Sequence, residues 1–157
     1  MIERLSVSNV LCEGLLNTDS LMKLVLQGIP MDDKSGSNLV KFIKQNVQIE
    51  NVQIIDCNLP PYTIADILME LEDNQSLINL SLRNNVLRQH KSNAQVASSL
   101  AKISQAPYFL HLEISGMLLG SEKVLKIVEE GVSHSKTMLG FHFNDNRVDH
   151  WTRMRIH

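Results

Sequence analysis

The chain has 157 residues, of which 43% are hydrophobic and 4% aromatic, and its 15 basic and 17 acidic residues leave a formal charge of −2 at pH 7. This length and apolar content suit one domain of ordinary size. Because the charges are balanced and dispersed, we expect no nucleic-acid or membrane partner, and the low aromatic content leaves little material for a base-stacking platform.

The N-terminal segment carries a charge pair within its first four residues and lacks a continuous apolar stretch, so it does not resemble a signal peptide. No run of about 18 apolar residues that could span a bilayer follows it. Cys12 and Cys57 fall in no zinc-binding spacing and are too few for a disulfide framework. These features predict a reducing, cytoplasmic environment.

One pattern recurs from the N-terminus onwards, L-x-x-L-x-L-x-x-N/C-x-L, with other apolar residues allowed at the leucine positions. Units that fit it begin at positions 2, 21, 49, 77, 109 and 138, so the first interval is the shortest and the later ones are similar in length. In the unit "LINLSLRNNVL", Leu77, Leu80, Leu82 and Leu87 occupy the apolar positions and Asn85 the polar one. We expect a solenoid of about six units over residues 1–148 and a tail or partial cap over residues 149–157.

Each unit is predicted to contain a strand followed by a helix. Positions one, four, six and eleven are expected to point inward and stack on the next unit. In the short first unit these positions predict a strand within residues 2–12, with room afterwards for a turn or a short helical stretch around residues 13–19. In the later units, helical spacing follows each strand, through Leu39, Phe42, Ile43, Ile64, Ile67, Leu68, Leu71, Val96, Leu100, Ile103, Val124, Ile127 and Val128.

These units resemble the ribonuclease-inhibitor type of leucine-rich-repeat protein over residues 2–148. The resemblance implies an α/β fold, a curved solenoid with a parallel sheet on its concave face and helices on its convex face. Ile29 and Met117 depart from the usual pattern, because a polar Asn or Cys normally occupies their position. We expect looser or differently bonded turns at these two residues.

The ninth position of the pattern predicts a structural role. An asparagine there can bond backbone groups as the chain leaves the strand, and a cysteine can fill the same space as a small, weakly polar residue. We assign this role to Cys57, Asn85 and Asn146. Cys12 and Cys57 are both interpreted as core residues and not as nucleophiles.

The strand residues that point away from the predicted core form a candidate protein-binding surface on the concave face. They are polar, short and of mixed charge, which suits protein recognition. Arg83 is the expected anchor, because it is a long planar cation among short neighbours. The predicted binding residues are Gln53, Ile55, Ser81, Arg83, Glu113, His142 and Asn144.

A search for chemistry in the sequence favours no catalytic site. His111, Glu113 and His142 would lie near one another on adjacent parallel strands and are legitimate zinc ligands, but period-two alternation places such side chains together without any metal. The chain has no G-x-S-x-G, G-x-G-x-x-G or Walker loop. We therefore predict no catalytic residue, no metal, no cofactor and no enzyme activity.

Two functional hypotheses remain. The first is a non-catalytic interaction scaffold, such as a docking subunit of a cytoskeletal or ciliary assembly, because "LGFHFNDNRVD" is similar to the last repeats of leucine-rich-repeat proteins of ciliated protists. The second is a substrate-recognition adaptor for a partner enzyme such as a ubiquitin ligase. No polar capping unit precedes the unit at residue 2, so we also expect the ends to continue into other material or to dock on a partner.

Overall fold

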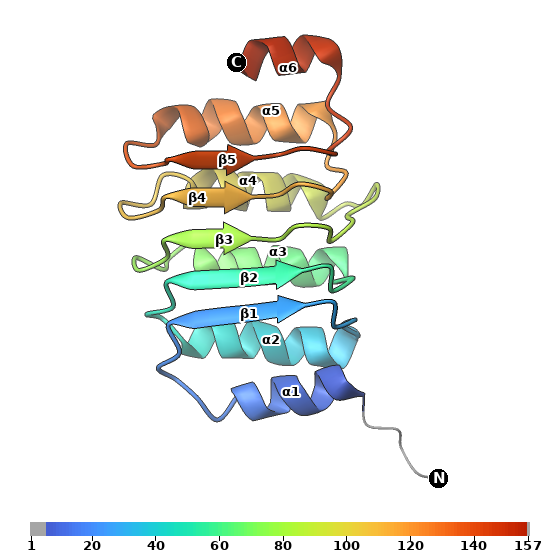
Figure 1. The fold of residues 1–157 in the computed structure, drawn as a ribbon, viewed down its shortest axis with the longest axis vertical. Helices are drawn as coiled ribbons and strands as arrows, with labels where there is room; N and C mark the ends of the chain where they lie inside the picture. The colour runs from blue at the N-terminus through green and yellow to red at the C-terminus, as the bar shows by residue number, and fades with distance from the viewer. Residues whose placement is uncertain (1–5, 157) are drawn as a thin grey trace.

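The computed structural model describes residues 6–156, which form a row of β–α units (Figure 1). In this part of the chain the strands are β1 (Lys23–Gln27), β2 (Asn51–Ile55), β3 (Asn79–Ser81), β4 (His111–Glu113) and β5 (Gly140–His142). The helices are α1 (Val7–Leu15), α2 (Asp33–Gln45), α3 (Pro61–Leu71), α4 (Asn93–Ile103), α5 (Ser121–Glu130), the 3-10 helix η1 (Val132–His134) and α6 (His150–Ile156).

The strands form one parallel sheet whose spatial order, β1-β2-β3-β4-β5, is also the order along the chain. Figure 1 shows α2 to α5 in a second layer behind the sheet, with α1 and α6 extending that layer at the two ends. The predicted α/β class and parallel sheet are confirmed, and the arrangement is consistent with a solenoid-like repeat. Each helix among the described residues is too short or too polar to cross a lipid bilayer.

The first predicted unit is the one that the structure changes. Residues 1–5 lie outside the described part, but the strand expected over residues 2–12 is replaced from Val7 onwards by α1. The hydroxyl of Ser6 accepts the N–H of Asn9 at 3.2 Å and caps this helix. Ser8 and Cys12, one helical turn apart, are its buried residues. The strand prediction is therefore wrong over residues 7–12, because small and apolar residues at helical spacing also satisfied the repeat pattern.

The core lies between the sheet and the helix layer. The fourth position of each unit forms one row across the sheet, in which Leu24, Val52, Leu80, Leu112 and Phe141 are successive partners. The first four of these side chains are at most 4% exposed. Burying such a side chain contributes about 1.5–3 kcal/mol. Of the residues predicted to form the helical side of the core, all except Val128 are buried.

Backbone hydrogen bonds join the units at the amino edge of the sheet. The carbonyl of Met22 accepts the N–H groups of Glu50 and Asn51 at 2.9 and 3.0 Å. The carbonyl of Glu50 in turn accepts those of Ile78 and Asn79 at 2.8 and 3.1 Å. The same two-bond arrangement recurs at the carbonyls of Ile78 and Leu110. Each unit therefore satisfies backbone groups of the next, as expected for a quasi-one-dimensional stack.

Beyond each strand, one residue of the unit turns the chain through the left-handed region. The eighth position of the five units has φ between 53° and 74°, and it holds Gly28, Asp56, Asn84, Gly116 and Asp145. Glycine, asparagine and aspartate tolerate this conformation best. At Gly116 a Cβ atom would also collide with the Asn84 side chain, so the absence of a side chain is required there.

The turns at Ile29 and Met117, which lack the polar ninth residue, keep their backbone bonds. The N–H of Met31 donates to the carbonyl of Cys57 at 2.9 Å, and that of Leu87 donates to the carbonyl of Met117 at the same distance. Met117 is fully buried, whereas Ile29 is half-buried. The ninth residue of these two turns therefore forms no polar side-chain bond of its own, but the backbone connection is kept.

The C-terminal helix α6 packs against the last unit. The side chain of Asp149 accepts the N–H of Thr152 at 2.8 Å, and Arg155 pairs with Glu129 of α5 at 2.6 Å. Thr152 is buried, and Ile156 packs against the core. Trp151, the only tryptophan in the sequence, is 76% exposed.

Candidate interaction surface

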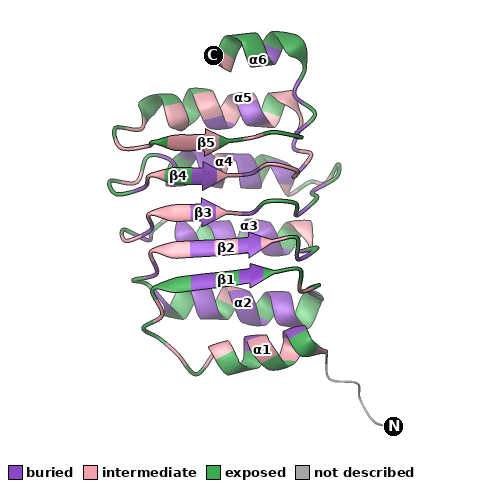
Figure 2. Ribbon diagram, in the orientation of Figure 1, coloured by how far each residue is buried: buried purple, intermediate pink, exposed green. Residues whose placement is uncertain are grey.

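One side of the sheet is not covered by helices. In β1 to β4, buried side chains alternate with exposed or half-buried ones, whereas β5 contains no buried residue (Figure 2). We define the open sheet face as the side chains of strand positions three and five, which point away from the core. Its two rows contain Lys23, Asn51, Asn79, His111 and Gly140, and Val25, Gln53, Ser81, Glu113 and His142.

The predicted binding residues lie on the open sheet face or directly beyond its strands. Gln53 and Ser81 are neighbours in the sheet register, and Ser81 in turn neighbours Glu113. Gln53, Ile55, Ser81 and Glu113 are half-buried, whereas Arg83, His142 and Asn144 are exposed. Their assignment to a binding surface stays a prediction, but their side chains are accessible from one side of the molecule.

The histidines and the glutamate on this face are arranged in a diagonal. Glu113 lies opposite His142 in the register, and His111 lies opposite Gly140. The Glu113 carboxylate accepts the N–H of Ser115 at 2.9 Å, which turns it along its own strand. Within residues 6–156 no group of three or more His, Cys, Asp or Glu side chains is placed to hold a metal ion.

Asn85 joins two units through a fully buried amide. Its Oδ1 accepts the N–H groups of Cys57 and Leu59 at 3.2 and 3.3 Å, and its Nδ2 donates to the carbonyls of Ile54 and Leu82 at 2.6 and 3.0 Å. Every buried polar atom of this side chain is thereby paired. The amide holds the end of β2 against the end of β3 and sets the shape of the surface above them.

Asn146 repeats this arrangement in the last unit, just before α6 in the sequence. Its Oδ1 accepts the N–H of Leu119 at 3.1 Å, and its Nδ2 donates to the carbonyls of Ile114 and Phe143 at 2.8 and 2.9 Å. Cys57 occupies the same ninth position in the unit that starts at Ile49. Its thiol donates to the carbonyl of Ile55 at 3.3 Å. The ninth position is thus a bonding position in three of the described units.

Both thiols are unsuited to nucleophilic chemistry. Cys12 and Cys57 are fully buried and free. Burial, together with the charge of Asp32, raises the pKa of Cys12 to about 11. Burial also raises the pKa of Cys57, although hydrogen bonds with the backbone at Ile29 and Gly28, in the turn of the preceding unit, oppose this shift. Because the reactive species of cysteine is the thiolate, neither residue is activated at neutral pH.

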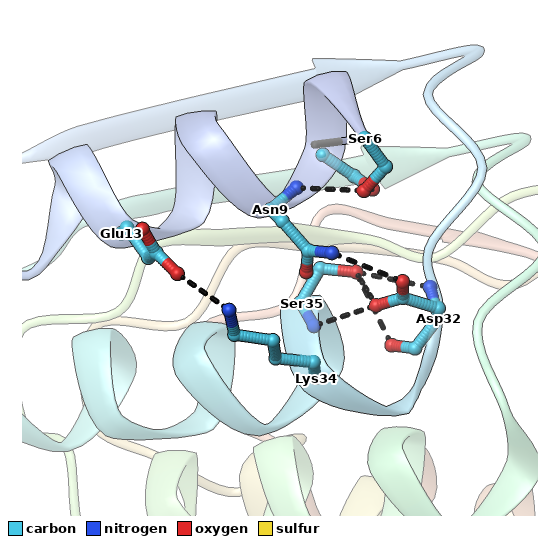
Figure 3. A network of polar contacts seen from close by, with 7 residues as sticks. Ser6, Asn9, Glu13, Asp32, Lys34 and Ser35 are labelled. Atoms are coloured by element: carbon cyan, nitrogen blue, oxygen red, sulfur yellow. Dashed lines mark hydrogen bonds and ion pairs between the residues drawn. The ribbon is translucent and has the colours of Figure 1, made fainter. Parts of the chain in front are cut away.

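A polar network fastens α1 to α2 (Figure 3). The Asn9 amide donates to Asp32 at 3.2 Å, and the other oxygen of Asp32 accepts the N–H of Ser35 at 2.8 Å, in a reciprocal capping box. Hydrogen bonds from the hydroxyl and N–H of Ser35 lower the pKa of Asp32. Lys34 pairs with Glu13 of α1 at 2.9 Å. This network attaches the first helix to the stack in place of the strand that was predicted there.

The sequence interpretation missed two residues that hold the loops entering β1 and β2. Asn46 is 1% exposed; its Oδ1 accepts the N–H of Leu21 at 2.8 Å and its Nδ2 donates to the carbonyl of Thr18 at 3.0 Å. Asn74 donates to the carbonyl of Ile49 at 3.3 Å. Both asparagines follow the last turn of a helix, and this recurrence was the available signal. They fix where the strands begin.

A row of exposed apolar side chains at the amino edge was also missed. These side chains lie in the loops that lead into the strands, and their exposed fractions range from 53% to 75%. The row contains Met22, Val47, Tyr108 and Leu139. It borders the open sheet face and adds to the apolar area that Val25 contributes to a mostly polar surface.

Comparison with known proteins assigns no relative, since no protein-family model and no curated protein matches the chain.

Proposed function

We propose that the chain is a leucine-rich-repeat solenoid of the ribonuclease-inhibitor type that acts as a non-catalytic protein-interaction scaffold. The observation that carries this proposal is the open sheet face, an uncovered side of a parallel sheet with accessible polar side chains at regular spacing. Parallel sheets are usually covered on both faces. An uncovered face whose strand ends are held by the buried amides of Asn85 and Asn146 is a rigid surface for recognition, because little conformational entropy is lost when a partner binds.

The proposed role within the cell is that of a docking subunit in a larger assembly, such as a cytoskeletal or axonemal one. The mixed charge of the face favours a protein partner over nucleic acid or lipid. Arg83 is the proposed anchor, since it is exposed and its backbone carbonyl is held by the N–H of Asp56 at 2.9 Å. Arginine is enriched among binding hot spots, and a fixed backbone limits the entropy that is lost when the partner binds.

The test is affinity purification from the native source with a quadruple variant, called the open-face variant, that changes three residues of the open sheet face together with Arg83, which lies just beyond β3. Glu113→Gln is used because an amide oxygen can still accept the Ser115 N–H. The variant combines Gln53→Ala, Arg83→Ala, Glu113→Gln and His142→Ala. We expect the variant to fold and to lose its co-purifying partner by at least tenfold.

The matched control changes the same kinds of side chain on the helix side and its loops. All four control residues are exposed, and they are Lys41, Asp66, Gln75 and His134, each changed to Ala. If this control loses the partner while the open-face variant keeps it, the interface lies on the helix side. The identity of the captured protein separates an assembly subunit from the adaptor hypothesis, for which the partner would be an enzyme.

A further inference from the structure

The helix layer ends in a different helical surface at each side of the stack. Figure 1 shows α1 at one end of this layer and α6 at the other. Within residues 6–156, α1 packs against α2 and α6 packs against α5, and no second helix covers the outer side of either. These two outer sides are the places where the layer could be continued by another molecule.

The outer side of α1 is a shallow strip of small residues. The buried residues of this helix are Ser8 and Cys12. Helical periodicity places Val7, Val10 and Gly14 on the opposite side. Val7 is 77% exposed and Val10 is 54% exposed, and a Cβ atom added to Gly14 would meet no neighbouring atom within 4 Å. We call these three residues the α1 strip, a surface with room for a large side chain.

The outer side of α6 has large apolar side chains instead. Thr152 is buried and Ile156 packs against the core, so these two residues define the inner side of the helix. Trp151 and Met154, which are 76% and 61% exposed, lie away from that side and one helical turn apart. The His150 ring lies edge-on to the indole, with ring centroids 6.1 Å apart, and limits its freedom. The two ends are therefore complementary in size, with large side chains on α6 and small ones on α1.

The two terminal helices also differ in charge. α6 contains Arg153 and Arg155 and no carboxylate, whereas α1 contains Glu13 and no cation. Arg155 pairs with Glu129 of α5 at 2.6 Å, but Arg153 is exposed and forms no ion pair among the described residues. Glu13 pairs with Lys34 at 2.9 Å. The strongest local contrast is therefore between the guanidinium of Arg153 and the acidic surroundings of α1.

The neighbouring charges keep this contrast. Residues 7–34, which include α1, contain four carboxylates and two cations, whereas residues 121–156, which include α6, contain five carboxylates and six cations. Beside α6, Asp149 accepts hydrogen bonds from Thr152 and Glu130 pairs with Lys126. The end of the stack at α1 is therefore negative and the end at α6 weakly positive, which favours contact between unlike ends over contact between like ends.

We propose that the α1 strip of one copy of the chain receives Trp151 and Met154 of a second copy, so that the two helix layers join head to tail. This inference goes beyond the proposed scaffold function, because it uses neither the open sheet face nor its partner. The contact is heterologous, so each copy keeps one unused end and further copies can add in a row. The open sheet face stays uncovered, because the contacting helices belong to the other layer (Figure 1).

The contact is expected to be specific but weak. Tryptophan is enriched among binding hot spots, and methionine adapts its shape to a partner surface. Two short helices bury less area than a standard interface of about 1,600 Å². The edge strands β1 and β5 add nothing directly, since α1 and α6 extend beyond them in the helix layer and meet first. We therefore expect association between micromolar and millimolar concentrations of the chain.

The first test is sedimentation velocity of the unmodified 157-residue chain at low ionic strength. The weight-average mass should rise continuously with concentration and pass the mass of a dimer, because a head-to-tail contact does not close on itself. Added salt should weaken the association, since unlike charges contribute to it.

Two variants each block one end. The α6 variant combines Trp151→Ser and Met154→Ser, and the α1 variant combines Val10→Lys and Gly14→Gln. Lysine and glutamine favour a helix more than the valine and glycine that they replace, so the α1 variant should fold at least as well as the unmodified chain. Each variant alone should associate at least tenfold more weakly. An equimolar mixture should form a one-to-one complex and nothing larger, because it contains one intact α1 strip and one intact α6.

Tyr108→Ser is the matched control, because it removes a side chain that is 66% exposed but lies at the amino edge of the sheet. This variant should associate as the unmodified chain does. The proposal is overturned if the unmodified chain stays monomeric at millimolar concentration, or if either end variant associates as strongly as the unmodified chain. It is also overturned if the mixture of the two variants associates no better than each variant alone. Circular dichroism and urea midpoints of all variants verify that a loss of association is not a loss of folding.

Discussion

The unit containing β3 and the unit containing β5 have the same pattern of residues but differ in burial. Leu80 and Leu82 in the central unit are at most 1% exposed, whereas Phe141 and Phe143 at the equivalent positions are only half-buried, although their rings stack at 5.1 Å. Both units pair in register with the strand before them. The difference shows that burial in a stack is set by the unit that follows, and not by the residues of the unit itself.

The largest expected effect separates the inward and outward positions of the central strand. Leu80→Asp should prevent cooperative folding, because an unpaired carboxylate in the core costs several kcal/mol, a large share of the stability of one domain. Asn79→Asp, one residue earlier on the open sheet face, should change the free energy of unfolding by less than about 1 kcal/mol. Urea denaturation of both variants measures this, and equal midpoints would contradict the assigned register.

The next effect compares the two buried asparagines. Asn85→Ala should lower the free energy of unfolding by about 4 kcal/mol, because it leaves backbone groups of two fully packed turns without partners. Asn146→Ala should cost about half as much, since water can reach the more open last unit and bond the groups that it exposes. Chemical denaturation of the two variants provides the comparison. A larger loss for Asn146 would mean that the C-terminal unit is the more tightly packed one.

Hydrogen exchange sharpens the same contrast without mutation. The amides of β2, β3 and β4 should exchange at least tenfold more slowly than those of β5 and α6, because local opening of a stack begins at units that pack on one neighbour only. Mass-spectrometric exchange on the unmodified chain measures this gradient. Uniform protection from β2 to α6 would show that the short C-terminal helix closes the stack as well as a full unit does.

The smallest effect is a local pH dependence at the C-terminal helix. Hydrogen bonding to Ser121 and to the N–H and hydroxyl of Thr152 lowers the pKa of Asp149 to about 2, from a usual value near 3.8. Because the folded-state pKa is depressed, this contribution to stability is present above about pH 4 and is lost as the pH falls towards 2. Exchange protection of α6 should therefore decrease over this range.

Asp149→Asn gives the control for that pH dependence. The variant should show weaker protection of α6 at pH 6 and little further change between pH 4 and pH 2, while α2 keeps its own dependence through Asp32, whose pKa is also lowered. An unchanged pH profile in the Asp149 variant would assign the effect to another carboxylate.

The repeat pattern by itself determined the parallel sheet, the alternation of strands and helices and most of the core. It could do so because the inward positions keep the same spacing within each unit, and residues such as Leu80 have no role other than packing. The ninth-position amides of Asn85 and Asn146 were also accessible from the sequence, since a buried amide at a strand end has few ways to pair.

Only the tertiary structure decided the identity of the first element and the form of the ends. The stretch from Val7 to Cys12 satisfies a strand pattern and a helix pattern equally. Its helical state depends on the cap of Ser6 and on the polar network with Asp32, which lies beyond β1 in the sequence. The exposure of Trp151 and Met154 likewise depends on how α6 packs, with Arg155 paired to Glu129 of α5. Local residue spacing does not predict these contacts. They join segments that are far apart in the sequence, and only the folded stack brings those segments together.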